Sequence, residues 1–169
     1  MQSVKVVITG PFNAGKTTFI RAVSEIAVLS TERQVSESSA EGQGETTVAM
    51  DFGRITISDE VVLYLFGTPG QERFSFMWET LSEGMLGFVV LVDGTSADSV
   101  RDAAGVLGFF TEMSDVPFVV AANQVDPLDH PTQRELRQQL ALSGDVPLLG
   151  MDAREREDVK AVLLSLIHI

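Results

Sequence analysis

The chain has 169 residues, of which 24 are acidic, 12 are basic and none is cysteine, so its formal net charge is −12. This length predicts one domain over residues 1–169, and the negative charge argues against nucleic acid as a partner. No apolar run has the length of a membrane span, and neither end carries an acylation or prenylation signal, so no direct membrane anchor is expected. The lack of cysteine and of a leader-like N-terminus predicts a cytoplasmic protein.

Short apolar runs rich in β-branched residues alternate with helical patterns along the chain. The predicted strands are Val4 to Thr9, Met50 to Ile57, Val61 to Phe66, Leu86 to Val92, Pro117 to Ala122 and Val146 to Leu149. The predicted helices are Lys16 to about Leu29, Ala97 to Met113, Thr132 to Leu142 and Glu155 to Ile167. This alternation predicts a three-layer α/β domain with a mostly parallel sheet. Met50 to Ile57 alternates in polarity, which predicts an antiparallel strand at the sheet edge.

Ser30 to Glu45 fits neither pattern. The segment is polar, rich in Ser, Glu and Gly, and longer than a routine connection. It is predicted to be a loop, either a mobile surface loop or a functional one.

A phosphate-binding motif follows the first strand. Gly10 to Thr18, GPFNAGKTT, matches G-x-x-x-x-G-K-[ST] at the start of the first helix, which predicts a P-loop. Backbone amides and a helix N-terminus surround a phosphate in such a loop, while the lysine reaches the terminal phosphates and the following hydroxyl lies where Mg²⁺ binds. The predicted nucleotide-binding residues here are Asn13, Ala14, Gly15, Lys16, Thr17 and Thr18.

Selection of the base is predicted further on, in AANQVD. Asn123 and Asp126 end a buried strand at N-x-x-D spacing. A carboxylate can accept two hydrogen bonds from guanine N1 and the 2-amino group, which adenine cannot offer together, so Asp126 is the predicted guanine selector. Taken alone, the tetrapeptide also fits a turn-forming Asn/Asp pair.

The stretch Asp152-Ala153-Arg154 follows the last predicted strand. The backbone amide of Ala153 is predicted to meet the guanine O6, and Arg154 to pack over the base or ribose. A second interpretation is a helix cap, with Asp152 facing the N-terminal dipole of the last helix.

The order GPFNAGKT, TTVAMDF, GTPGQE, NQVD and DAR resembles the five motifs of Ras-like small GTPases over nearly the whole chain. Among these proteins it is most similar to the bacterial branch that includes the gliding-motility polarity GTPases and the GTP-binding proteins encoded beside roadblock-type partners. The resemblance implies a P-loop NTPase fold of the Ras-like kind, with a six-stranded sheet, GTP and GDP binding with Mg²⁺, slow hydrolysis and two switches. It also implies a regulatory or effector protein on the switch surface, with a roadblock-type partner as one candidate.

The resemblance assigns a metal role to Thr47. This residue opens TVAMDF and is implied to be the switch I threonine that ligates Mg²⁺ together with Thr17, with Thr46 as the alternative register. Ser30 to Glu45 then becomes switch I, a loop expected to be ordered only with triphosphate.

In switch II the resemblance implies that the amide of Gly70 bonds the γ-phosphate and that Gln71 orients the attacking water. Gln71, Lys16 and Thr47 form the implied catalytic set. Downstream, apolar residues from Phe74 to Leu81 recur at the spacing of a helix, and Phe76 falls on the opposite, acidic face, where it is a candidate for contact with a partner.

Three departures from the family pattern stand out. Gly67 replaces the aspartate that usually holds Mg²⁺ through water, Gln124 replaces the lysine of N-K-x-D, and Phe12 is bulky where many relatives have glycine. Gln124 is still expected to contact the nucleotide, with some loss of affinity. Asp51 and Asp93 are considered as replacements, but the resemblance implies a structural role for Asp93, and Asp51 is expected on the edge strand. Gly67 is therefore expected to make GDP binding less dependent on Mg²⁺ than in relatives with the acid.

These observations together predict a slow GTPase that acts as a molecular switch. One alternative is a nucleotide-bound scaffold or interaction module with negligible hydrolysis. A third interpretation is an ATP-dependent P-loop enzyme, against which Asp126 and the lack of a lid-like insertion argue.

Overall fold

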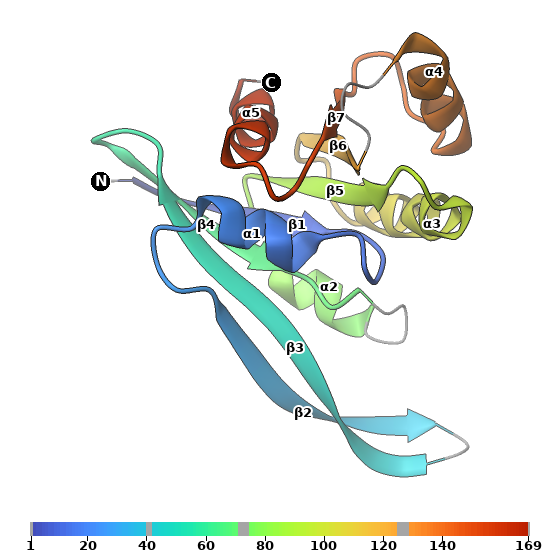
Figure 1. Ribbon diagram of the computed structural model, residues 1–169. Coiled ribbons are helices and arrows are strands. Elements are labelled where there is room, and N and C mark those ends of the chain that lie inside the picture. The colour runs from blue at the N-terminus through green and yellow to red at the C-terminus, as the bar shows by residue number, and fades with distance from the viewer. Residues whose placement is uncertain (1, 40–41, 71–74, 125–128, 169) are drawn as a thin grey trace.

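The computed structural model describes residues 2–39, 42–70, 75–124 and 129–168, with the backbone alone for 29–39, 42–49 and 130. Figure 1 shows how its strands and helices alternate. The elements are β1 (Gln2–Thr9), α1 (Lys16–Val23), β2 (Leu29–Ser39), β3 (Gly42–Thr56), β4 (Val61–Gly67), α2 (Phe76–Leu81), β5 (Gly87–Asp93), α3 (Ala97–Met113), β6 (Phe118–Asn123), α4 (His130–Gln139), β7 (Leu148–Met151) and α5 (Arg156–Ile167). Within the described ranges, no helix combines the length and the apolar character needed to cross a bilayer.

One sheet contains all of these strands, in the order β2-β3-β4-β1-β5-β6-β7. Neighbouring strands from β4 to β7 run parallel, whereas β3 is antiparallel to β4 and β2 is antiparallel to β3. The six strands from β3 to β7, with their interleaved helices, confirm the predicted Ras-like P-loop fold. Strand β1 lies in the middle of the sheet, so the loop at its carboxyl end opens where parallel α/β sheets bind ligands.

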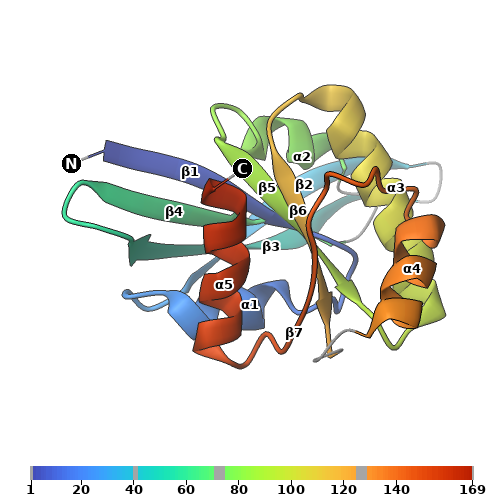
Figure 2. The same cartoon turned by 90° about the horizontal axis from the view of Figure 1, so that it is seen from above.

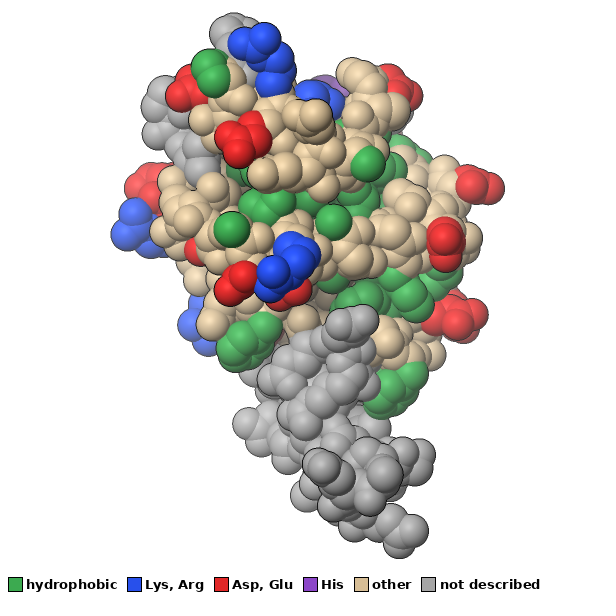
Figure 3. Space-filling model, turned by 90° about the vertical axis from the view of Figure 1, so that its right-hand side faces the viewer, with side chains coloured by type: hydrophobic (Ala, Val, Ile, Leu, Met, Phe, Trp, Pro, Cys, Tyr) green, Lys and Arg blue, Asp and Glu red, His purple; other side chains and the backbone are tan. Residues whose placement is uncertain are grey.

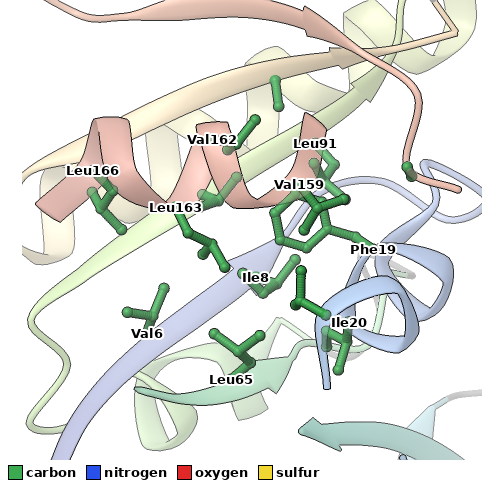
Figure 4. Packing of buried hydrophobic residues seen from close by; sticks show 14 of the residues in the cluster. Val6, Ile8, Phe19, Ile20, Leu65, Leu91, Val159, Val162, Leu163 and Leu166 are labelled. Atoms are coloured by element: carbon green, nitrogen blue, oxygen red, sulfur yellow. The ribbon is translucent and has the colours of Figure 1, made fainter. Parts of the chain in front are cut away.

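The strands are apolar on both faces because helices cover both sides of the sheet. Successive residues of β1 alternate between two cores: Val6 and Ile8 belong to one, and Val7 belongs to the other. In the first core these side chains pack with Phe19 of α1 and Leu163 of α5, as Figure 4 shows. This packing fixes α1, and with it the loop that precedes it, against the carboxyl half of the sheet.

The opposite face of the sheet is covered by α2, α3 and α4, on the other side from α1 and α5 (Figure 2). Its core includes Val7 and Val90 from the strands, Trp78 from α2, Phe110 from α3 and Leu136 from α4. Trp78 stacks on Phe110 with the ring centroids 5.8 Å apart. The indole therefore fixes the short helix α2 to the core.

Helix α1 is shorter than predicted, since it ends at Val23 rather than near Leu29. The reason is a set of bonds between the following residues and β3. The hydroxyl of Ser24 accepts a hydrogen bond from a backbone amide of β3 at 3.1 Å, and the Glu25 carboxylate accepts two from Thr56, at 2.8 and 2.9 Å. These hydrogen bonds stabilise an extended conformation after Val23, so the helix ends there.

The segment Ser30 to Glu45 is not the predicted loop. Most of it lies in β2 and the first part of β3, which pair in continuous antiparallel register from Leu29 opposite Phe52 to Ser39 opposite Gly42. We call β2 together with residues 42–49 of β3 the arm, and Figure 1 shows it extending beyond the helices. The sheet thus gains a seventh, outermost strand, which makes β3 an inner strand. The prediction failed because a pair held by backbone hydrogen bonds needs no apolar periodicity.

Candidate functional site

The loop between β1 and α1 is shaped by residues in the left-handed region of backbone space. Asn13 has a φ of 66° and Gly15, which caps α1, has a φ of 105°. A Cβ atom on Gly15 would lie 2.5 Å from Nδ2 of Asn123, so only glycine fits there without displacing that side chain. The sequence motif therefore corresponds to a tight turn into the N-terminus of α1, as expected of a P-loop.

Lys16 begins α1 and turns its side chain back over this loop. Its ammonium group is buried and donates hydrogen bonds to the carbonyls of Gly10 and Pro11, both at 2.8 Å. Burial lowers the pKa of Lys16 to about 8, and the negative charge of Asp51 partly opposes this shift. A cation held in a dry loop is well suited to bind phosphate oxygens.

The start of the predicted switch II lies against the same loop. Gly70 follows β4, and a Cβ atom on it would lie 2.7 Å from both Nζ of Lys16 and the backbone nitrogen of Phe12. The chain is held there by the buried hydroxyl of Thr68, which donates to Thr9 at 2.8 Å, and by the Trp78 indole, which donates to the carbonyl before Gly70, also at 2.8 Å. The structure thus brings the predicted γ-phosphate contacts Lys16 and Gly70 together.

Asn123 connects three segments of the site. Its buried side-chain amide donates to the carbonyl of Ala14 at 3.1 Å, and its Oδ1 accepts from the amides of Gln124 and Ala153, each at 3.0 Å. The P-loop, the end of β6 and the loop before α5 are therefore joined through one side chain. The Ala153 amide, predicted to meet a base oxygen, is bonded to Asn123 in this arrangement.

A pocket of about 480 Å³ opens at the carboxyl ends of β6 and β7, beside the P-loop helix. Its lining residues are Thr18, Asn123, Gln124, Met151, Asp152, Ala153 and Arg154. All but Met151 and Asp152 were predicted to bind nucleotide, so the pocket is the candidate site for the base. Asp126 and the rest of 125–128 lie outside the described residues.

Asp152 does not cap the last helix, as one interpretation of the sequence had it. The N-cap of α5 is Glu155, and Asp152 instead accepts a hydrogen bond from the backbone amide of Arg154 at 2.9 Å, which closes a local turn. The Arg154 guanidinium also lies on this carboxylate, with Nη2 2.7 Å from Oδ2. Arg154 is therefore oriented at the pocket rim by its neighbour.

The Arg154 pair gives a pH-dependent signal that can be measured. The guanidinium and the backbone amide of Arg154 lower the pKa of Asp152 to about 2. The pKa in the folded protein lies below the ordinary value of about 3.9. The ion pair therefore stabilises the folded state above that pH, and this stabilisation is lost as the pH falls through 2. Replacing Arg154 with alanine should raise the pKa of Asp152, measured by NMR titration of its carboxyl carbon. An unchanged value would mean that the guanidinium does not hold the carboxylate.

Thr17 and Asp51 meet beside the phosphate end of the site. The Thr17 hydroxyl donates a hydrogen bond to Oδ2 of Asp51, which reaches it from β3. A hydroxyl and a carboxylate are hard oxygen ligands of the kind that Mg²⁺ prefers, so these residues fit the implied metal. Among the residues that the structure describes, no group of three or more His, Cys, Asp or Glu side chains is placed to hold a metal.

Comparison with known proteins places the chain in a family. Residues 8–168 match the profile of a family described as "Conserved hypothetical ATP binding protein". The chain belongs to that family.

Individual relatives extend this picture. An uncharacterized protein of Methanocaldococcus jannaschii is 31% identical over 123 residues, which are 73% of this chain and 71% of the relative. Ras-related protein SEC4 of Candida albicans is 27% identical over 130 residues, 73% of this chain but only 62% of its own length. Ras-related protein Rab-7b of Bos taurus is 27% identical over 158 residues, 89% and 74% of the two chains. This member of the ATP-binding family is thus a P-loop, nucleotide-binding protein with distant similarity to small GTPases.

Two of the residues predicted to be catalytic lie among the described residues. Lys16 lies at the P-loop, whereas Thr47 does not. The backbone places Thr47 in β3 opposite Gln34, four residues before Asp51, which is roughly 13 Å along an extended strand. The alternative, Thr46, lies in the same strand and is one residue further from Asp51. Gln71 lies outside the described residues. The contact between Asp51 and Thr17 was not predicted, because it depends on the register of β3 against β4.

Proposed function

We propose that the protein binds GTP and GDP with Mg²⁺, hydrolyses GTP slowly and acts as a nucleotide-dependent switch, as a single G domain in the cytoplasm. We also propose that, among small GTPases, the protein belongs with the bacterial gliding-motility GTPases. One observation carries most of its weight, the packing of Gly70 on the Lys16 ammonium at the end of the P-loop. A terminal phosphate bound at Lys16 is thereby sensed directly by the segment that leads to α2, which is what a switch requires.

The proposed choice of guanine over adenine rests on the residue type at Asp126 and on the pocket lined by Asn123 and Ala153. A carboxylate can bond both N1 and the 2-amino group of guanine, whereas adenine offers no such donor pair. The family description, which names ATP, favours the alternative of an adenine nucleotide. Identification of the nucleotide that remains on the purified protein separates these two proposals, because only the guanine site retains GDP.

Magnesium is proposed to bind through the Thr17 hydroxyl and, in the triphosphate state, through Thr47. The metal would neutralise charge on the phosphate oxygens. In the described arrangement Thr47 belongs to the arm, so its proposed role requires the arm to change its position relative to α1. We therefore propose that the arm is the switch I segment and that its paired form corresponds to a state without a bound γ-phosphate.

The enzymatic part of the proposal depends on Gln71. If Gln71 orients the attacking water, Gln71→Ala should lower the single-turnover rate of GTP hydrolysis roughly tenfold or more, because catalysis of phosphoryl transfer is mostly positioning. The affinity for GTP should be unchanged. Glu72→Ala is the matched control, since Glu72 is the next residue in the sequence and has no assigned role. Equal rates in all three proteins would exclude Gln71 and favour the scaffold alternative.

A protein partner is proposed for the surface around Phe12 and Phe76, whose exposed fractions are 62% and 56%. A groove of about 380 Å³ beside Phe12 is lined in part by Trp78 and Phe109 and borders Gly70. Figure 3 views the side of the molecule with the P-loop and α3, where apolar side chains lie among charged ones. Because this surface adjoins the phosphate end of the site, a bound regulator or effector would contact the elements proposed to switch.

A further inference from the structure

The side chain of Asp51 lies over the position where residue 67 lacks a side chain. Asp51 in β3 stands directly opposite Gly67 in β4, and directly opposed residues of an antiparallel pair project to the same face. A Cβ atom on Gly67 would lie 3.2 Å from Cβ of Asp51 and 3.5 Å from its Oδ2. The Asp51 carboxylate thus occupies the space that an aspartate at position 67 would use.

This carboxylate points toward the phosphate end of the site. Its Oδ2 accepts the hydroxyl hydrogen of Thr17, in the first turn of α1. It is also close enough to Lys16 to act on that ammonium group. Asp51 therefore joins β3 to the residue proposed to ligate Mg²⁺.

The other acid considered from the sequence serves a different purpose. Asp93, at the end of β5, accepts hydrogen bonds on Oδ1 from the amide and the hydroxyl of Thr95, at 2.9 and 2.6 Å. It closes the turn that leads toward α3. Of the two candidate acids, only Asp51 contacts Thr17 in the described structure.

We propose that Asp51 is the carboxylate that positions Mg²⁺ beside the P-loop, in place of the aspartate missing at Gly67. The carboxylate holds the Thr17 hydroxyl in place for the metal, the role that hydrogen-bonded partners of metal ligands commonly have. This inference rests on the proposed binding of a magnesium nucleotide. It replaces the expectation that Gly67 makes GDP binding less dependent on magnesium, because the acid has moved to the opposing strand.

The test measures how magnesium slows release of a fluorescent GDP from the full chain. Four proteins are compared across a magnesium chloride series and in EDTA: wild type, Asp51→Asn, Asp51→Ala combined with Gly67→Asp, and the control Asp59→Asn in the exposed turn after β3. Asp51→Asn should require at least about tenfold more magnesium for half of the effect, measured relative to its own release rate in EDTA. Returning the carboxylate to position 67 should restore the wild-type requirement, and Asp59→Asn should not change it.

An unchanged magnesium requirement in Asp51→Asn overturns the inference, as does wild-type release that magnesium does not slow. A faster rate in EDTA with the same magnesium requirement also overturns it, because that pattern marks a structural role only. Where Asp51→Asn does not fold, the double variant decides: a wild-type requirement supports the inference and a raised one contradicts it. The same series with fluorescent ADP separates this test from the guanine proposal, since an adenine-specific protein would fail the latter and still report on Asp51.

Discussion

Replacing Lys16 with methionine is expected to lower the affinity for GDP and GTP at least about a hundredfold. The ammonium group lies buried over the P-loop, 2.8 Å from two loop carbonyls, where its charge is weakly screened. Each charge-assisted hydrogen bond to a phosphate contributes about 1.5–3 kcal/mol, so the loss of two of them accounts for that change. Titration calorimetry with each nucleotide measures it.

The nucleotide-free Lys16→Met protein should remain folded. Methionine fills a similar volume, and removing a desolvated charge offsets much of the cost of leaving two carbonyls without their donor. The free energy of unfolding in urea is therefore expected to change by ~2 kcal/mol at most. Lys160→Met, on the exposed side of α5, is the matched control, since its contact with Glu157 at 3.8 Å is a surface ion pair of little energetic value. Affinity within threefold of wild type would contradict the role of Lys16.

The second large effect is expected for Asn123→Ala, which removes the side chain that joins the P-loop, β6 and the loop before α5. The substitution leaves the buried carbonyl of Ala14 and the buried amide of Ala153 without their present partners. At about 1–3 kcal/mol for each buried group, the free energy of unfolding should fall by about 3 kcal/mol. Urea denaturation of the nucleotide-free protein measures this directly.

Asn123→Ala should also weaken nucleotide binding, because the P-loop and the loop that lines the pocket before α5 lose their connection. Gln124→Ala is the control for stability: its side chain is exposed, so the free energy of unfolding should change by about 0.5 kcal/mol or less. If Asn123→Ala were as stable as Gln124→Ala, the hydrogen bonds of Asn123 would not stabilise the fold by joining the P-loop to the loop before α5.

The core of the fold could be predicted because its signals are local. The runs around Val6, Val90 and Val120 are apolar on both faces, which occurs where helices cover both sides of a parallel sheet, and α3 has the predicted bounds. The arm could not be predicted in this way. Its strands pair through the backbone beyond the layers of helices. Ser30 to Glu45 therefore needs no apolar face, and its sequence has no strand pattern.

The site was predictable in its parts and not in its connections. The P-loop, Gly70 and the lining of the pocket beside Asn123 follow from motifs, and the structure brings them to one edge of the sheet. The contact of Asp51 with Thr17 depends on which residue of β3 lies opposite Gly67, and a strand's register against its partner is not visible in a single sequence. Likewise, N-x-x-D spacing does not reveal that Asn123 bonds the P-loop.

We propose that Asp126, together with the pocket beside Asn123, selects guanine. The most direct measurement is competition of GDP and ADP for the wild-type protein and for Asp126→Asn, with xanthosine diphosphate as a third ligand. We expect the wild type to prefer GDP over ADP by on the order of a hundredfold, from two hydrogen bonds to a charged acceptor. The amide of the introduced asparagine offers a donor that suits the 2-oxo group of xanthine, so Asp126→Asn should lose GDP and gain xanthosine diphosphate. Equal affinity of the wild type for GDP and ADP, unchanged in Asp126→Asn, would contradict the account.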